Sequence, residues 1–218
     1  MISHDHYDHL DMASVRRLAA AGVPFFTALG VGAHLERWGV PVAQIHELDW
    51  WSEAEVAGVR VVATPSQHFS GRGLFDGNGT LWTSWSLIGP RHRAFFSGDT
   101  GLTPLLGEVG ERLGPFDVAL FEIGAFHPAW GAIHLGPHGA LEAHRLVRGR
   151  ALLPIHWSTF DLGPHPWDQP IERLWKDALD AGVPLLTPLI GAPFEPATAP
   201  APTPWWRSVG PKGDTLEG

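Results

Sequence analysis

Cysteine is absent from this sequence of 218 residues. Its absence excludes disulfide scaffolds, thiolate zinc sites, iron–sulfur clusters and cysteine nucleophiles. The sequence also has no apolar run near the ~20 residues that a membrane span needs. The first residues show neither the basic nor the apolar segment of a secretory signal peptide. We therefore expect a cytoplasmic protein without a transmembrane segment.

Basic residues are scarce. Lys and Arg number 15 against 23 Asp and Glu, so the formal net charge is −8, and the basic residues form no cluster. Proteins that bind nucleic acids hold the phosphate backbone with clustered Lys and Arg, so a nucleic-acid partner is not expected. The 26 Gly and 20 Pro indicate many turns and short elements rather than a helical bundle.

Histidine is abundant, with 13 residues, and it is concentrated at the start of the chain. The segment 4–9 reads His-x-His-x-Asp-His. Imidazoles with a carboxylate favour a divalent first-row metal. Four donors so close together can serve two ions, His4 and His6 for one, Asp8 and His9 for the other. The alternative is a polar, solvated segment.

Three further candidate ligands, His68, Asp99 and His156, each follow a predicted strand. Functional residues of layered α/β folds tend to lie on loops at one end of the sheet. Taken singly, each has a plainer interpretation, as a loop or buried histidine or as a turn-forming aspartate. Together with segment 4–9 they make seven ligands. Two zinc ions need about that many, with one bridging carboxylate and one bridging hydroxide.

The hydrophobic pattern predicts a layered α/β (α+β) architecture in which strands come first and then alternate with helices. Residues 1–191 form the predicted domain. The Pro- and Ala-rich tail 192–218 is expected to be an extended arm or disordered. The predicted helices cover 11–22, 32–38, 104–113, 137–147 and 170–181. The predicted strands cover 23–28, 44–50, 59–64, 81–88, 94–97, 116–123, 151–155 and 183–189.

The order of these candidate ligands resembles the metallo-β-lactamase superfamily of dinuclear zinc hydrolases. Five segments further resemble the bacterial relatives of N-acylphosphatidylethanolamine-hydrolysing phospholipase D: Gln67–Arg72, Ser97–Gly101, Gly114–Leu120, Ile123–Ala125 and Leu153–Trp157. The resemblance covers about residues 2–191 and implies a four-layer αββα fold. Several strands normally precede the first metal motif of this fold, whereas three residues do here. We therefore expect the fold to lack its first N-terminal strands, and a non-catalytic fragment is one reading of the chain.

The resemblance also implies roles for the candidate residues. One zinc would be held by His4, His6 and His68. The second would be held by Asp8, His9 and His156. Asp99 would bridge the two ions, and a hydroxide between them would attack the substrate. Manganese or iron would tolerate the same ligands.

His134 is the counterpart of a functional histidine that precedes a Pro-headed helix in the phospholipase D-like branch. It would contact the substrate phosphate or assist the leaving group, so the implied catalytic residues are Asp8, Asp99 and His134. The plainer reading is a loop histidine. This chain departs from the branch at His138 and Gly139, where an acidic pair is usual. Asp5 and Thr100 are candidates to hold the ligand imidazoles.

The implied activity is that of a zinc-dependent phosphodiesterase acting on a small-molecule or phospholipid-like substrate. A lactone or ester hydrolase of the same fold is the alternative, and the oligomeric state stays open. Some aromatic rings could shape an apolar substrate site, although core packing is the more common role of tryptophan. These rings are Trp82, Trp85, Trp130 and Trp157. The pairs Trp50–Trp51 and Trp205–Trp206 could anchor at a membrane surface, but the chain has no basic face to support that reading.

Overall fold

The computed structural model describes residues 1–209. Its strands are β1 (Phe25–Ala28), β2 (Ile45–Leu48), β3 (Glu53–Val56), β4 (Val59–Thr64), β5 (Ser84–Ile88), β6 (Arg93–Phe96), β7 (Phe116–Glu122) and β8 (Gly149–Ile155). Its α-helices are α1 (Met12–Ala20), α2 (Gly32–Arg37), α3 (Leu105–Arg112), α4 (Gly136–Leu146) and α5 (Gln169–Asp180). Short 3-10 turns are η1 (Val42–Gln44), η2 (Pro128–Trp130), η3 (Pro196–Thr198) and η4 (Trp205–Ser208).

The strands form two sheets. The larger sheet has the order β3-β4-β5-β6-β7-β8, antiparallel from β3 to β6 and parallel from β6 to β8. The smaller sheet pairs β1 with β2 in parallel, and Ile2 adds an isolated parallel bridge to Thr27. Two successive antiparallel pairings leave β4 parallel to β6. The strands β4, β6, β7 and β8 therefore all end at the same edge of the larger sheet.

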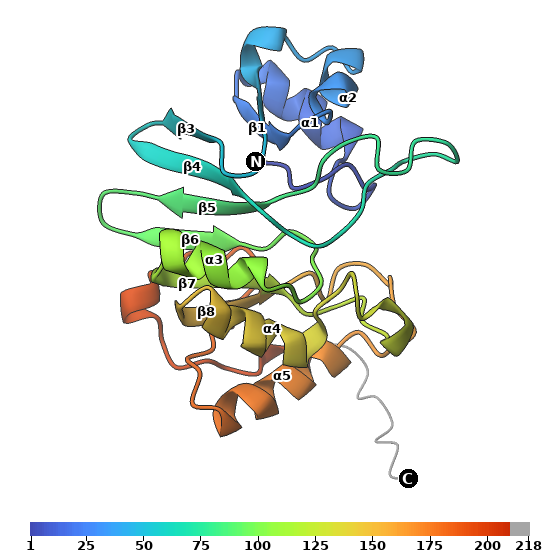
Figure 1. Cartoon of the computed structure of the whole chain (residues 1–218). Coiled ribbons are helices and arrows are strands. Elements are labelled where there is room, and N and C mark those ends of the chain that lie inside the picture. The colour runs from blue at the N-terminus through green and yellow to red at the C-terminus, as the bar shows by residue number, and fades with distance from the viewer. Residues whose placement is uncertain (210–218) are drawn as a thin grey trace.

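Apolar contacts arrange these elements in four layers (Figure 1). Buried residues of α3, α4 and α5 pack on one face of the larger sheet around Phe95 and Phe121. On the other side of the molecule, buried residues of α1 and α2 pack against Phe25 of β1. Phe26 and Trp85 meet between the two sheets. The αββα order implied by the family resemblance is confirmed.

Local sequence explains where the first helix begins. Asp11 adopts an extended backbone and its Oδ2 accepts a hydrogen bond from Ser14 N at 2.7 Å, as an N-cap does. The helix therefore starts at Met12, shortly after His9, which is the last residue of segment 4–9. None of the helices within residues 1–209 is both long and apolar enough to span a membrane.

Two secondary-structure predictions fail. The strand predicted over 183–189 is limited to an isolated bridge between Leu152 and Leu185. Pro184 and Pro188 lack the backbone N–H that a ladder needs, which explains why pairing does not extend. The pattern also missed β3, a short edge strand with alternating exposed glutamates.

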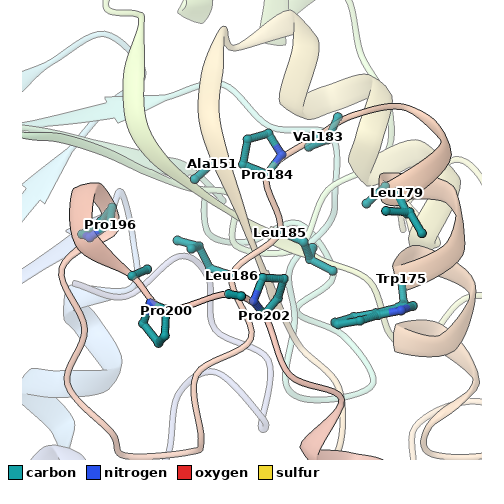
Figure 2. Close-up of a pocket in the computed structure, with 13 residues that line it drawn as sticks. Ala151, Trp175, Leu179, Val183, Pro184, Leu185, Leu186, Pro196, Pro200 and Pro202 are labelled. Atoms are coloured by element: carbon teal, nitrogen blue, oxygen red, sulfur yellow. The ribbon is translucent and has the colours of Figure 1, made fainter.

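The C-terminal segment was predicted to be an extended or disordered arm, and its described part, 192–209, instead packs on the domain. Trp206 is 1% exposed, and its Nε1 donates to Glu172 of α5 at 2.8 Å. This segment and α5 enclose an apolar cavity of about 330 Å³ beside Leu186 (Figure 2). The cavity is lined by alanine, valine, leucine, proline and tryptophan, so it carries no acid–base or metal chemistry. Residues 210–218 of the predicted tail lie outside the described residues.

Candidate metal centre

The seven predicted ligands come together at the sheet edge where β4, β6 and β8 end. His68 follows β4, Asp99 follows β6 and His156 follows β8. The segment 4–9 runs from the Ile2 bridge to α1 and crosses this edge. Parallel strands bring residues that are far apart in sequence to one place, because their carboxyl ends share an edge.

Three imidazoles form the first ligand group: His4, His6 and His68. Their nitrogens converge, with His4 Nε2 2.9 Å from His6 Nδ1 and His68 Nε2 3.3 Å from the same atom. All three offer a ring nitrogen to a common point, and imidazole nitrogen is a preferred ligand of first-row metals. The arrangement fits one metal ion.

Two carboxylates and two imidazoles form the second ligand group: Asp8, His9, Asp99 and His156. His9 Nε2 lies 3.1 Å from both Asp8 Oδ2 and Asp99 Oδ2. His156 Nε2 lies 3.3 Å from Asp8 Oδ2 and 3.5 Å from Asp99 Oδ2. The mixed nitrogen and oxygen donors fit a second divalent ion.

Asp99 lies between the two groups. Its Oδ2 contacts His9 and His156 of the second group and is 3.9 Å from His68 Nε2 of the first. Its Oδ1 is buried without a hydrogen-bond partner within residues 1–209. Orphaned buried acceptors are costly unless a cation or a partner satisfies them. The donor set therefore fits a pair of metal ions that share Asp99.

The two groups differ in their protonation. Burial lowers the pKa of His68 to about 4 and places the pKa of His4 well below its usual range. Burial acts in the same direction on His9, but the carboxylates of Asp8 and Asp99 outweigh it and raise its pKa to about 10. The first group is therefore neutral and ready to bind a cation, whereas the second holds a proton that a metal must displace.

The partners behind the ligand rings are not those that the sequence indicated. Asp5 is buried and accepts from Gly71 N at 2.8 Å, with His34 Nε2 at 3.3 Å, so it positions the loop after His68. Thr100 Oγ1 accepts from Gln67 N at 2.8 Å and ties together the loops of two ligands. Neither is hydrogen-bonded to the imidazole of a ligand within residues 1–209.

Two other groups hold ligand rings instead. Ser3 Oγ lies 3.0 Å from His4 Nδ1, and the carbonyl of Ile133 lies 3.0 Å from His68 Nδ1. Such contacts fix which nitrogen faces the metal. Sequence reasoning missed both contacts. The contact with Ile133 left no signal in the sequence, because a backbone carbonyl is the same in every residue type.

One ligand of the second group, His156, has a strained backbone. His156 has φ 61°, in the left-handed region that non-glycine residues seldom adopt. The backbone of Gly124 packs so closely against the His156 carbonyl that a Cβ there would overlap it. Gly98 has φ 56° and its backbone lies against Ser3, which sets the turn that presents Asp99. Strain of this kind accumulates at functional sites.

His134 lies beside the ligands but is tied to a different residue. Its Nδ1 is 3.0 Å from Oε2 of Glu122, which ends β7 and is fully buried. Burial opposes protonation of His134, but the hydrogen bond and the charge of Glu122 prevail and raise its pKa. Burial raises the pKa of Glu122, whereas its hydrogen bond to His134 acts to lower it. Sequence reasoning missed Glu122, although its place at the end of a strand between those of Asp99 and His156 could have indicated it.

A cavity of about 270 Å³ opens onto the ligands and is partly apolar. Its non-polar lining comes from Phe69, Ala125, Trp130, Ile133 and Leu162. Of the four tryptophans considered in the sequence, Trp130 alone lines this cavity; Trp85 is fully buried in the core. Trp157 packs against Trp206, the residue considered above as a surface anchor, which is buried here.

Comparison with known proteins identifies the family. A family model described as the beta-lactamase superfamily domain matches residues 1–157. An uncharacterized protein of Mycobacterium tuberculosis is 48% identical over 211 residues, covering 95% of this chain and 56% of that protein. The N-acyl-phosphatidylethanolamine-hydrolyzing phospholipase D 1 of Caenorhabditis elegans is 36% identical over 194 residues, covering 83% of this chain and 54% of that protein. The chain belongs to the beta-lactamase superfamily.

A solved structure supports the fold. Igni18, a metallo hydrolase from the archaeon Ignicoccus hospitalis, matches with a TM-score of 0.67 at 23% identity, covering 88% of this chain and 76% of that one. The chain spans little more than half the length of the two curated relatives described above.

Proposed function

We propose that this chain is a metal-dependent hydrolase that holds two zinc ions and cleaves a phosphodiester. The observation that carries the proposal is the place of Asp99, whose Oδ2 lies 3.1 Å from His9, 3.5 Å from His156 and 3.9 Å from His68. One carboxylate oxygen thus reaches both ligand groups, and a shared carboxylate is what a two-metal site needs. His4, His6 and His68 would hold one ion. Asp8, His9 and His156 would hold the other.

Bound at these groups, two divalent ions would lower the pKa of coordinated water to about 7 and neutralise negative charge on the substrate. The protein's own residues orient the reactants. Asp8 and Asp99 bring negative charge to one side of the cavity, and His134 lines the same cavity. In hydrolysis, a water oxygen bonds to phosphorus and the bond from phosphorus to the leaving alcohol breaks. His134 is placed to give that alcohol oxygen its proton or to contact the phosphate.

The lining of the cavity and one relative support a phospholipid-like substrate. Phe69, Trp130 and Leu162 offer apolar contact beside the ligands, which suits an acyl or lipid-like leaving group. The Caenorhabditis elegans relative is named for the hydrolysis of N-acyl-phosphatidylethanolamine. Zinc is the proposed metal because the donor set combines imidazole and carboxylate; manganese or iron would accept the same ligands.

The test begins with metal content per chain on purified protein, followed by turnover. We expect about two zinc equivalents and faster hydrolysis of a bis-aryl phosphate than of a simple lactone. Reconstitution with zinc, manganese or iron would then rank the metals by kcat/KM. Two bound ions with turnover of the lactone alone would assign a carbonyl hydrolase in place of the phosphodiesterase. Near-zero metal in the folded chain would contradict the proposal.

A further inference from the structure

The apolar cavity between α5 and the C-terminal segment has no part in the proposed hydrolysis. Its volume of about 330 Å³ falls at the lower end of the range of small-molecule sites, about 300–1,000 Å³. It borders Ala151 near the beginning of β8, whereas the ligand His156 follows the end of that strand. Within residues 1–209, no residue lines both this cavity and the one that opens onto the ligands. The two cavities are therefore separate.

We propose that this cavity binds the alkyl chain of a fatty acid or a similar amphiphile, with the head group left in solvent. The inference goes beyond the proposed function and does not rest on it, because no candidate metal ligand belongs to the cavity.

The lining offers contact to carbon and no charge. Among the described residues that form it, the indole of Trp175 is the one polar side-chain group, and the others are alanine, valine, leucine and proline. Apolar cavities of this kind stay dry and accept apolar guests. A hydrocarbon chain therefore gains contacts here without displacing well-bound water.

Three parts of the chain enclose the cavity. Figure 2 shows Trp175 and Leu179 on α5, Leu185 and Leu186 on the segment beside β8, and Pro202 on the C-terminal segment. Leu179 is 76% exposed although it lines the cavity, so it lies at the rim. A chain can therefore enter from solvent past an apolar side chain.

A second apolar cavity of about 270 Å³ adjoins the first. Leu186 and the residues 199–202 line both. The hydroxyl of Thr187, which borders the second cavity, is already used: Oγ1 donates to Thr203 O and accepts from Thr203 N, both at 3.1 Å. The adjoining cavities thus give room for a longer chain than the first cavity alone would hold.

Hydrogen bonding favours an alkyl chain over a peptide as the occupant. The backbone beside the cavity is already paired, since Leu152 N donates to Pro184 O and Leu186 N donates to Leu152 O, each at 2.8 Å. Pro200 and Pro202 have no N–H to offer. A peptide segment here would bury its own N–H and C=O groups without partners, which costs free energy. An alkyl chain carries no such groups.

Calorimetric titration of the full chain with decanoate, below its micelle concentration, tests the proposal. We expect one decanoate per chain and a negative heat-capacity change, because apolar surface is buried. Octanoate should bind roughly tenfold more weakly, since it buries two fewer methylenes. Decan-1-ol should bind within a few-fold of decanoate, because no charged residue lines the cavity. Absence of decanoate binding, or binding that requires the carboxylate, would overturn the proposal.

Spectra of the indole N–H groups locate the bound chain. Trp175 lines this cavity, whereas Trp130 lines the cavity at the metal centre. Decanoate should shift the signal that is lost in Trp175→Phe and should leave the signal that is lost in Trp130→Phe in place. A shift of the Trp130 signal without one at Trp175 would place the chain at the metal centre and overturn the proposal. Neither readout depends on whether the protein hydrolyses a phosphodiester.

Ala199→Phe fills the cavity from the C-terminal segment, because Ala199 packs against the apolar cluster that contains Ala151 and Leu186. The ring should weaken decanoate binding roughly tenfold or more, since it takes the space of several methylenes. Ala197→Phe is the matched control: this exposed residue of the same segment lines neither cavity, so the affinity should not change. Native affinity in Ala199→Phe would overturn the proposal, and the titration of the native chain decides even where this variant does not fold.

A second copy of the chain is the alternative occupant. Titrations at rising protein concentration, with sedimentation in parallel, distinguish it from the alkyl chain. We expect the affinity for decanoate to be independent of protein concentration. An affinity that falls as the protein dimerises would show that a second copy fills the cavity, and would overturn the proposal.

Discussion

The two ligand groups lie side by side but differ in charge. The first has three imidazoles and no carboxylate, whereas the second combines two imidazoles with Asp8 and Asp99. Burial keeps the first group neutral, and its pKa values fall. Carboxylates keep a proton on the second, where the pKa of His9 rises to about 10. The same residue type is therefore neutral in one group because of desolvation, and protonated in the other because of ion pairing.

The two groups also differ in the residues that hold their ligands in place. The first group rests on Ser3 and on a backbone carbonyl. The second depends on a strained turn at His156, and the next residue, Trp157, packs against Trp205 and Trp206 of the C-terminal segment. We therefore expect the second group to be the more sensitive to distant substitutions.

The largest effect is expected at the residue that the groups share. Asp99→Ala removes the only carboxylate oxygen that reaches both groups within the described chain. Metal content should fall from about two ions to one or fewer, and kcat/KM should fall by roughly 10³-fold or more, since metal charge stabilisation is worth several kcal/mol. Metal analysis and steady-state kinetics measure both. Hydrolysis at the native rate in this variant would end the two-metal interpretation.

Single-group variants test whether the groups act separately. His68→Ala should remove one ion and leave the second group loaded. His156→Ala should do the reverse, because His68 is a ligand of the first group and His156 of the second. Metal content per chain, with calorimetric titration of the remaining site, distinguishes the two cases. Loss of both ions in either variant would mean that the groups form one cooperative site.

A substitution outside the ligand groups can remove the packing of the C-terminal segment on Trp157. Trp206 is 1% exposed and packs on Trp157 and Trp175. Trp206→Ala should lower the free energy of unfolding by about 3–5 kcal/mol, the usual cost of a buried tryptophan. It should also weaken metal binding in the second group before the first. Trp167→Ala is the control, since that side chain is 42% exposed and should cost far less. Denaturant unfolding gives both values.

His144 provides a pH effect that is independent of the metal centre. It is 4% exposed on α4, and burial, helped by the charge of Arg145, lowers its pKa to about 4. The unfolded chain binds this proton near pH 6.5, so the stabilisation is present above that pH and is lost as pH falls to about 4. The expected loss is about 3 kcal/mol.

His144→Leu should remove this acid sensitivity. The measurement is the difference in unfolding free energy between native and variant protein, both metal-free, across that pH range. A difference that stays constant with pH would show that His144 does not titrate as its burial implies.

The smallest effect concerns the helix that follows segment 4–9. Asp11→Ala removes the N-cap bond to Ser14 and should lower the free energy of unfolding by less than any variant above. Asp11→Asn keeps an acceptor and is the matched control. Metal content should not change in either variant, because the first turn of α1 is not part of either ligand group. A loss of metal in Asp11→Ala would show that the cap also positions His9.

Much of the site was visible in the sequence because its spacing is local. His4, His6, Asp8 and His9 lie within one six-residue segment, so no long-range pairing is needed to bring them near one another. His68, Asp99 and His156 could be proposed because each follows an apolar strand, and strand ends gather at one edge. Glu122 is the last residue of β7, at the same edge, but it belongs to no motif, and only the fold creates its three contacts.

The errors have a similar cause. The apolar run 183–189 has the composition of a strand, but its prolines limit pairing with β8 to one bridge. The proline-rich tail lacks periodicity, yet Trp206 finds Glu172 and a cluster of indole rings 30 or more residues away in sequence. Local pattern does not report such long-range burial.

The sequence by itself determined the ligand types, their order and most of the elements that carry them, because residue chemistry and hydrophobic period are local properties. The tertiary structure alone decided that Asp99 lies between two groups, that carboxylates surround His9 but not His4, and that Glu122 faces His134. These depend on which strand ends become neighbours and how deeply they are buried. Desolvation and ion pairing act through space, so they follow from the packed layers and not from spacing along the chain.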